Sequence, residues 1–391
     1  MGLVGEMLWA PQAGYAADAN ELYAIGAVQK GMGGAGVASP QDATWVLLNP
    51  AAIVDLEPRI DVIQEFLRVE LESRPRGIAR NPFAGELHDS SIVPITSLGV
   101  VWEGKHGTFG FGGFGMEGNK ADFPSPRTIP GLLGNGDRRS GYEVGRFPLA
   151  YAVPVTEHLA LGAAIVPVYT RFRTDSITLR LVPARADHHW DVAFGVGFEL
   201  AAYYHQPRWS VGATYSSRSW MQEYTLYEDD TVMWNLDLPQ KLQVGLAFRP
   251  TPRLEVVLDF KHIHWSDTKL FSLPTIQGGL GWHDQNYYKA GVSFQASPRL
   301  KLRAGVSLNK PPFSEDKAFI NALSPALGQT HLGAGFSYDV NRRSAVHMSL
   351  THVLHEEMTD NGRGDIFSKL GRGTEIGYGE DSVTLQYTYR F

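Results

Sequence analysis

The chain has 391 residues, a formal net charge of -6, no cysteine and 42 glycines, and only 19% of its residues are charged. This length fits two or three soluble domains, but a large all-β barrel also reaches it as a single unit. No run of about 18 apolar residues is present, which excludes a transmembrane helix, and the acidic balance argues against a nucleic-acid binder because no basic stripe can follow phosphates.

Residues 1–16 are mildly apolar and end in Gly14-Tyr15-Ala16, which is similar to a small-residue cleavage site. They lack the basic region that a secretory signal needs. We interpret them as the remnant of an export signal, with an ordinary N-terminus as the alternative. The absence of cysteine is compatible with an envelope protein that folds without disulfides.

Residues 17–56 do not alternate between apolar and polar positions and predict a compact plug, which we call the hatch. Glycines gather at 31, 33, 34 and 36, where they permit unusual backbone conformations and close packing against a wall. Asp42 is a candidate helix N-cap. Asn49-Pro50 predicts the end of one helix and the start of another with proline in its first turn. This segment is expected to pack inside a barrel or to cap it.

From about residue 95 onward, apolar residues alternate with small or polar ones for roughly eight to eleven positions before each turn. Residues 242–248 and 254–260 form one such pair around a proline turn, and residues 288–294 and 300–306 form another. Long polar segments, at 117–139, 223–235 and 356–380, lie between the strands. Short turns at one end and long loops at the other are typical of outer-membrane barrels.

The last ten residues alternate completely. Val383, Leu385, Tyr387, Tyr389 and Phe391 form one face, and the other face is polar. A soluble β-sandwich would also alternate, but its outer face would be solvated, whereas here the polar face mixes glycine, serine, threonine and paired charges, as a narrow lumen requires. We therefore predict an all-β fold, a transmembrane antiparallel β-barrel over residues 57–391 with the helical hatch inside its lumen.

Three motifs in order resemble the FadL/TodX family of outer-membrane transporters for hydrophobic compounds. The glycine-rich stretch followed by Asp42-Ala43 and Asn49-Pro50-Ala51 is similar to the hatch of that family. The second motif runs from Leu238-Pro239-Gln240-Lys241 to His264-Trp265-Ser266, and the third includes Trp282-His283-Asp284 and Lys310-Pro311-Pro312. The resemblance covers residues 18–391.

The resemblance implies a barrel of about 14 strands in the outer membrane of a Gram-negative bacterium, acting as a monomer without an enzymatic step, a metal or a cofactor. Hydrophobic molecules, either long-chain fatty acids or hydrocarbons, would bind in an apolar lumenal pocket and leave sideways into the membrane and its lipid and lipopolysaccharide. The expected gating residues are Gly33, Gly34, Asp42, Asn49, Pro50 and Ala51. For the lateral opening we expect an inward kink in the strand 95–102, caused by Pro94 and Gly99.

A fatty acid needs a cation for its carboxylate as well as an apolar tube. By resemblance this cation is Arg171, and Lys289 and Arg303 lie on the inferred lumenal face of adjacent strands. Alternatively, these are structural lumen charges paired with Asp259 or Glu255. An external capture groove is expected from Phe313, Phe319 and Leu323 around a short helix at 315–323, together with Ile129, Leu132 and Leu133. Alternatively, that segment only packs against the loop beneath it.

Other functions find less support in the sequence. His188 and His189 are adjacent in a predicted strand, so their side chains point to opposite faces and are not expected to share a metal. There is no Gly-x-Ser-x-Gly motif, and we expect no enzyme. The remaining alternatives are a general porin, a structural barrel used for adhesion, and an outer-membrane lipid-modifying enzyme.

Overall fold

The computed structural model describes residues 21–76, 87–123, 138–174, 190–224, 236–322 and 324–391. Its strands are β1 (Arg59–Arg74), β2 (Leu87–Glu103), β3 (Thr108–Phe123), β4 (Arg138–Arg146), β5 (Leu149–Pro154), β6 (Leu159–Thr174), β7 (Asp191–Gln206), β8 (Trp209–Ser216), β9 (Trp220–Met221), β10 (Lys241–Thr251), β11 (Leu254–Ile263), β12 (Gln285–Ser297), β13 (Leu300–Leu308), β14 (Thr330–Asp339), β15 (Ser344–Thr359) and β16 (Glu375–Arg390). Its helices are α2 (Gly26–Gly31), α3 (Trp45–Leu48), α4 (Lys269–Ser272) and α5 (Ile366–Leu370), with the 3-10 turns η1 (Pro50–Asp55), η3 (Trp265–Asp267), η4 (Thr275–Gln277) and η5 (Glu315–Lys317).

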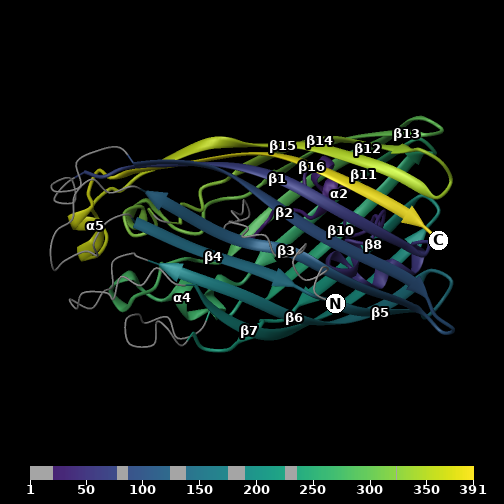
Figure 1. Cartoon of the computed structure of the whole chain (residues 1–391), viewed down its shortest axis with the longest axis horizontal. Coiled ribbons are helices and arrows are strands. Elements are labelled where there is room, and N and C mark those ends of the chain that lie inside the picture. The colour runs from purple at the N-terminus through teal and green to yellow at the C-terminus, as the bar shows by residue number, and fades with distance from the viewer. Residues whose placement is uncertain (1–20, 77–86, 124–137, 175–189, 225–235, 323) are drawn as a thin grey trace.

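The strand segments form one closed antiparallel barrel of 14 strands (Figure 1). The count is lower than the number of segments because two strands are interrupted. β4 and β5 both lie between β3 and β6, and β8 and β9 both pair with β7. The ladders β1–β16 and β6–β7 close the ring. The predicted fold class is therefore confirmed.

Period-two alternation sorts the side chains between the two faces of the wall. In β16, Leu385 and Tyr387 are 46% and 44% exposed on the outside, whereas the intervening Thr384, Gln386 and Thr388 are buried in the lumen. The two predicted hairpins are also confirmed, since β10 pairs with β11 and β12 with β13 in the expected register. An apolar outer belt on a wall that closes into a ring is the arrangement of a barrel that spans a bilayer.

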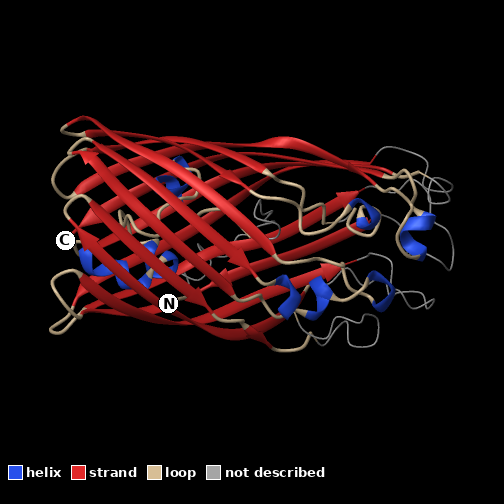
Figure 2. Ribbon diagram, turned by 180° about the vertical axis from the view of Figure 1, so that it is seen from behind, coloured by secondary structure: helices blue, strands red, loops and turns tan. Residues whose placement is uncertain are grey.

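The two ends of the barrel differ, as expected. Tight turns join the strands at the end that holds the C-terminus, and the loops with α4 and α5 lie at the other end (Figures 1 and 2). The strands are longer than predicted. Ladder pairs continue through residues 117–123 of β3 and through Glu356 and Glu357 of β15, which we had placed in loops. These extensions carry the wall beyond the apolar belt.

The described part of the hatch, residues 21–56, lies inside the barrel. α2 contacts the wall from β13 to β16, and η1 contacts β5, β6 and β7 on the opposite side. Trp45 and Met32 of this segment are completely buried. Among the described residues, no helix is long and apolar enough to cross a membrane.

Candidate functional site

Charged side chains of the wall hold the start of the hatch. Glu21 accepts hydrogen bonds from Lys241 Nζ at 2.5 Å and Lys261 Nζ at 2.7 Å, and Arg146 lies 3.6 Å away. Burial acts to raise the pKa of the Glu21 carboxyl, but the three cations outweigh it and hold that pKa well below its usual range. The carboxylate therefore stays ionised and bound to the wall.

A second set of contacts fixes the middle of the hatch. Asp259 Oδ2 of β11 accepts the backbone N–H groups of Gly36 at 2.6 Å and Val37 at 3.0 Å. Lys30 of α2 forms a buried ion pair with Glu65 of β1. Buried charges are stabilised by pairing and hydrogen bonding, as the Lys30–Glu65 pair and the two N–H groups on Asp259 Oδ2 show. The hatch is thus held by directional polar contacts as well as by packing.

The predicted Asn-Pro-Ala motif forms the second turn of the hatch. Asn49 ends α3, its Oδ1 accepts the Ala51 N–H at 3.1 Å, and its Nδ2 donates to Val37 O at 2.8 Å. Pro50 occupies the first position of η1, as predicted, because a missing N–H costs nothing there.

Asp42 differs slightly from its prediction. The N-cap of α3 is Thr44, and Asp42, two residues earlier, accepts the N–H of Thr44 at 2.9 Å. Its other oxygen accepts from Gln386 of β16 at 2.9 Å, so Asp42 also connects the hatch to the wall.

Glycines let the hatch backbone touch the wall. Gly33 has a left-handed φ of 65°, and a Cβ placed there would lie 2.1 Å from Val306 N. Gly34 is also left-handed, with φ 79°. Wall glycines provide matching room: a Cβ on Gly305 or on Gly333 would lie 2.1 Å from hatch backbone atoms. The small residues that the sequence places on the polar strand face therefore form a track for the hatch.

Substituting Gly33 by alanine is expected to loosen the hatch, because it combines a strained φ, worth about 1–2 kcal/mol, with a backbone clash. Hydrogen–deuterium exchange should increase across residues 32–38. Gly31→Ala is the matched control, since Gly31 has no positive φ and its nearest contact would be 3.3 Å. Equal exchange in both variants would contradict the track.

Lys289 and Arg303 face the lumen, as predicted, but both contact the hatch. Lys289, which lies opposite Asp259 in the β11–β12 ladder, donates from Nζ to Tyr23 O at 2.6 Å. Arg303 donates to Gln41 Oε1 at 2.7 Å and to Ser337 Oγ at 2.5 Å. These contacts give both charges a structural role, but these bonds are to carbonyl and hydroxyl oxygens and not to the predicted carboxylates of Asp259 or Glu255.

Arg171 does not lie where the resemblance had placed it. In β6 it shares a face with the outward Ile165, which is 61% exposed, while Thr170 and Phe172 on either side of it are buried. Arg171 Nε and Nη2 each donate to the Glu143 carboxylate at 2.8 Å, and its guanidinium lies 4.4 Å from the ring centre of Trp190. The structure therefore places this guanidinium on the outer wall and not in the lumen.

The loops at the end opposite the C-terminus close over an apolar cluster. Phe313 is 2% exposed, and Trp282 packs between it and Trp265. Trp265 and Trp282 are thus core residues of the loops. Beneath them the lumenal lining is apolar, with Leu67, Val69, Leu71, Val93, Ile95, Tyr287, Val353, Ile376 and Tyr378.

The predicted capture groove is only partly described. The segment expected as a helix at 315–323 has a single 3-10 turn, η5, followed by turns. Phe319 is partly buried and lies against Gly371. Leu323, Ile129, Leu132 and Leu133 lie outside the described residues.

The wall opens between β2 and β3. β2 pairs with β1 along its whole length, but its pairing with β3 stops at Leu98, opposite Gly113. Beyond this point β3 pairs with β4 instead. Among the residues that the structure describes, no ladder pair joins β3 to the β2 residues from Leu87 to Ser97. A bond of 3.4 Å from Gly115 N to Ser97 Oγ crosses between the strands.

The irregular pairing arises more from β3 than from β2, whose residues 95–102 were predicted to form the kink. Gly99 is paired on both sides, and a Cβ there would lie 2.8 Å from Ala43 of the hatch, so it makes room for the hatch and does not interrupt the ladder. Pro94 does lie in the one-sided part of β2, where a missing N–H is tolerated. The signal that sequence reasoning missed is the glycine run of β3, with Gly110, Gly112, Gly113 and Gly115.

Comparison with known proteins agrees with this geometry. The structure is similar to that of the toluene transporter TodX of Pseudomonas putida (TM-score 0.73, 16% identity, 95% of this chain and 99% of that one) and to a FadL homologue of Pseudomonas aeruginosa (TM-score 0.70, 13% identity, 95% and 100%). A Neisseria meningitidis serogroup B protein described as an outer membrane protein is 31% identical over 113 residues, which is 27% of this chain but only 24% of the relative. Residues 193–391 match the family of outer membrane protein transport proteins (OMPP1/FadL/TodX), and the chain belongs to this family.

Proposed function

We propose that this outer-membrane protein is a passive channel through which small hydrophobic molecules pass from the apolar upper lumen, sideways between β2 and β3, into the membrane. The observation that carries the proposal is the end of the β2–β3 ladder at Leu98. The lumenal side chains at that point, Val93 and Ile95, are apolar and buried. An apolar molecule gains free energy by leaving a lumen into hydrocarbon and not into water.

The hatch supports the lateral route because it blocks the lumen, through which a molecule would otherwise pass straight along the barrel. Residues 21–56 fill the lumen toward the end with the tight turns and are fixed there by the contacts of Glu21, Lys30 and Asp42. A wide aqueous porin has no use for such a plug. Movement of the hatch, with Gly33 and Gly34 against the wall, is proposed to adjust the space beneath the ligand. The barrel closes on itself, and we propose that it acts as a monomer surrounded by lipid and lipopolysaccharide.

The cargo class that fits best is neutral. Each lumenal cation described above already has a partner: a carboxylate for Lys30, Lys241 and Lys261, and a carbonyl oxygen for Lys289 and Arg303. A fatty acid would have to displace one of these partners to place its carboxylate. The solved relative TodX is a toluene transporter by name. We therefore propose hydrocarbons such as toluene ahead of long-chain fatty acids.

The proposal can be tested by a reversible cross-link between β2 and β3, at the point where their ladder ends. Because the chain has no cysteine, Ser97→Cys with Gly115→Cys gives two defined thiols for a short, reducible cross-linker. Uptake of radiolabelled toluene by cells that express this variant is expected to fall to the level of empty-vector cells after cross-linking, and to return after reduction. Labelled oleate measured in the same cells ranks the two cargo classes.

The matched control is Val100→Cys with Phe111→Cys, which joins positions of the same two strands that are already paired. Cross-linking there should leave toluene uptake unchanged. Unchanged uptake with the Ser97–Gly115 link would exclude the lateral route. Uptake no faster than in empty-vector cells for wild type, together with entry of small sugars, would favour a porin.

A further inference from the structure

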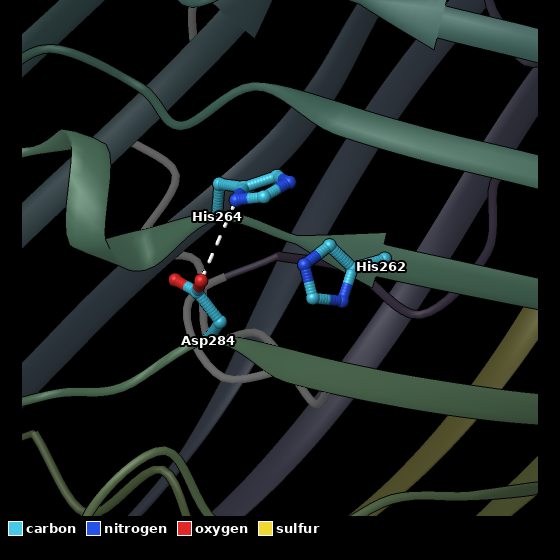
Figure 3. Close-up of side chains that lie close together, drawn as sticks. All are labelled: His262, His264 and Asp284. Carbon is cyan, nitrogen blue, oxygen red and sulfur yellow. Dashed lines mark ion pairs between the residues drawn. The ribbon is translucent and has the colours of Figure 1, made fainter.

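We propose that the outer wall carries a binding site for one divalent transition-metal ion of the zinc class, formed by His262, His264 and Asp284 at the extracellular edge of β11 and β12. One ligand atom from each of these residues lies within 4.8 Å of the others. Figure 3 shows the two imidazoles and the carboxylate facing one another, with His264 Nδ1 3.4 Å from Asp284 Oδ2.

The site follows from strand geometry. Residues two apart in a strand share a face, and in β11 this face carries the exposed Leu258 before it reaches His262. The intervening Lys261 points into the lumen, where it binds Glu21. The two histidines therefore lie together on the outside, just beyond the apolar belt. His188 and His189, which are adjacent in sequence, do not have this spacing.

Neighbouring groups orient the ligands as a metal site requires. His262 Nδ1 lies 2.6 Å from Asn286 Oδ1, and a proton donated from Nδ1 to this amide oxygen would leave Nε2 with the free lone pair that a metal needs. Ser266 N donates to Asp284 Oδ1 at 2.9 Å and holds the carboxylate in place. Such outer contacts are characteristic of metal-binding histidines and carboxylates.

The ligand set selects the kind of ion. Two imidazole nitrogens with one carboxylate suit zinc, copper or nickel, whereas calcium and magnesium prefer sets of oxygen ligands. Three protein ligands leave one coordination position for water, as in open zinc sites.

A second group of possible metal ligands is a weaker candidate for a metal site. Glu72, His355 and Glu357 also lie close together, but Arg74 already binds both carboxylates, with Nη2 3.1 Å from Glu72 Oε2 and Nη1 3.6 Å from Glu357 Oε1. No lysine or arginine plays this part among the described residues around His262, because the neighbouring Lys261 points into the lumen.

The experiment is a calorimetric titration of zinc chloride into the full chain in detergent, after removal of any affinity tag and of bound metal with a chelator. Wild type is expected to bind one ion per chain. His264→Ala and Asp284→Asn should abolish saturable binding, and Asn286→Ala should weaken it by about 10–100-fold, the usual effect of losing an outer contact.

The matched control is His352→Ala. His352 and Asp381 form an outward His–Asp pair at 2.8 Å on β15 and β16, but no third ligand joins them in the part of the chain that the structure describes. This variant should bind zinc as wild type does, and so should His188→Ala with His189→Ala. The proposal is overturned if wild type shows no saturable zinc binding, or if His264→Ala binds as tightly as wild type. Neither result bears on toluene uptake, so this inference and the proposed function fail separately.

Discussion

Deletion of residues 21–53 is expected to convert the protein into a permanently open aqueous pore. The hatch supplies the buried Met32 and Trp45 and fills the lumen. Without it, the inner wall presents glycine, serine, threonine and charged side chains. A barrel of about eight strands can fill its interior with its own side chains, but one of 14 strands is closer in size to the porins, which hold water. Planar-bilayer recordings should show stable conductance where wild type is nearly closed.

The barrel itself should survive the deletion, because its ladders do not pass through the hatch. Heat-modifiable migration in gels and outer-membrane fractionation verify folding. Entry of a hydrophilic antibiotic into cells should rise in parallel with conductance. A folded deletion variant that conducts no better than wild type would show that something other than the hatch closes the lumen. In that case the glycine track would have only a structural role.

The barrel could be predicted from sequence because its determinants are local. Alternation along residues 242–248 and 254–260 assigns each side chain to a face without reference to the rest of the chain, and the β10–β11 ladder has that register. The Asn49-Pro50 turn depends on neighbouring residues in the same way. Helical expectations for 315–323 were wrong because the apolar spacing there serves packing under a loop and not a helix face.

The binding residues were harder to predict because they depend on contacts between distant segments. Glu21, for example, binds Lys241 and Lys261, which lie more than two hundred residues further along the chain. Arg171 is a different case. Period-two alternation from Ile165 places it on the outward face, whereas the resemblance to the family implies a lumenal position; the structure follows the periodicity.

Glu21→Gln is expected to release the start of the hatch. The substitution leaves the shape nearly unchanged but strips Lys241, Lys261 and Arg146 of their shared carboxylate. Removing one partner of a buried charge network typically costs about 3–5 kcal/mol, because the remaining buried charges lose the counter-charge that they shared. Limited proteolysis and hydrogen exchange of residues 21–31 should therefore increase strongly at pH 7. Glu57→Gln is the control, since the Glu57 side chain is 77% exposed and its ion pair with Arg390 is a surface contact.

The effect should depend on pH in a defined direction. The folded-state pKa of Glu21 is depressed, so the stability that its ionised form contributes is fully present above the unfolded pKa, near 4.3, and is lost as the pH falls through the lower folded value. The difference between wild type and Glu21→Gln in hatch protection should thus be constant from pH 8 to about pH 5 and shrink only in stronger acid. A difference that already disappears near pH 6 would mean that Glu21 is not held in its ionised form by the three cations. The hatch would then be anchored chiefly by Asp259 and by the glycine track.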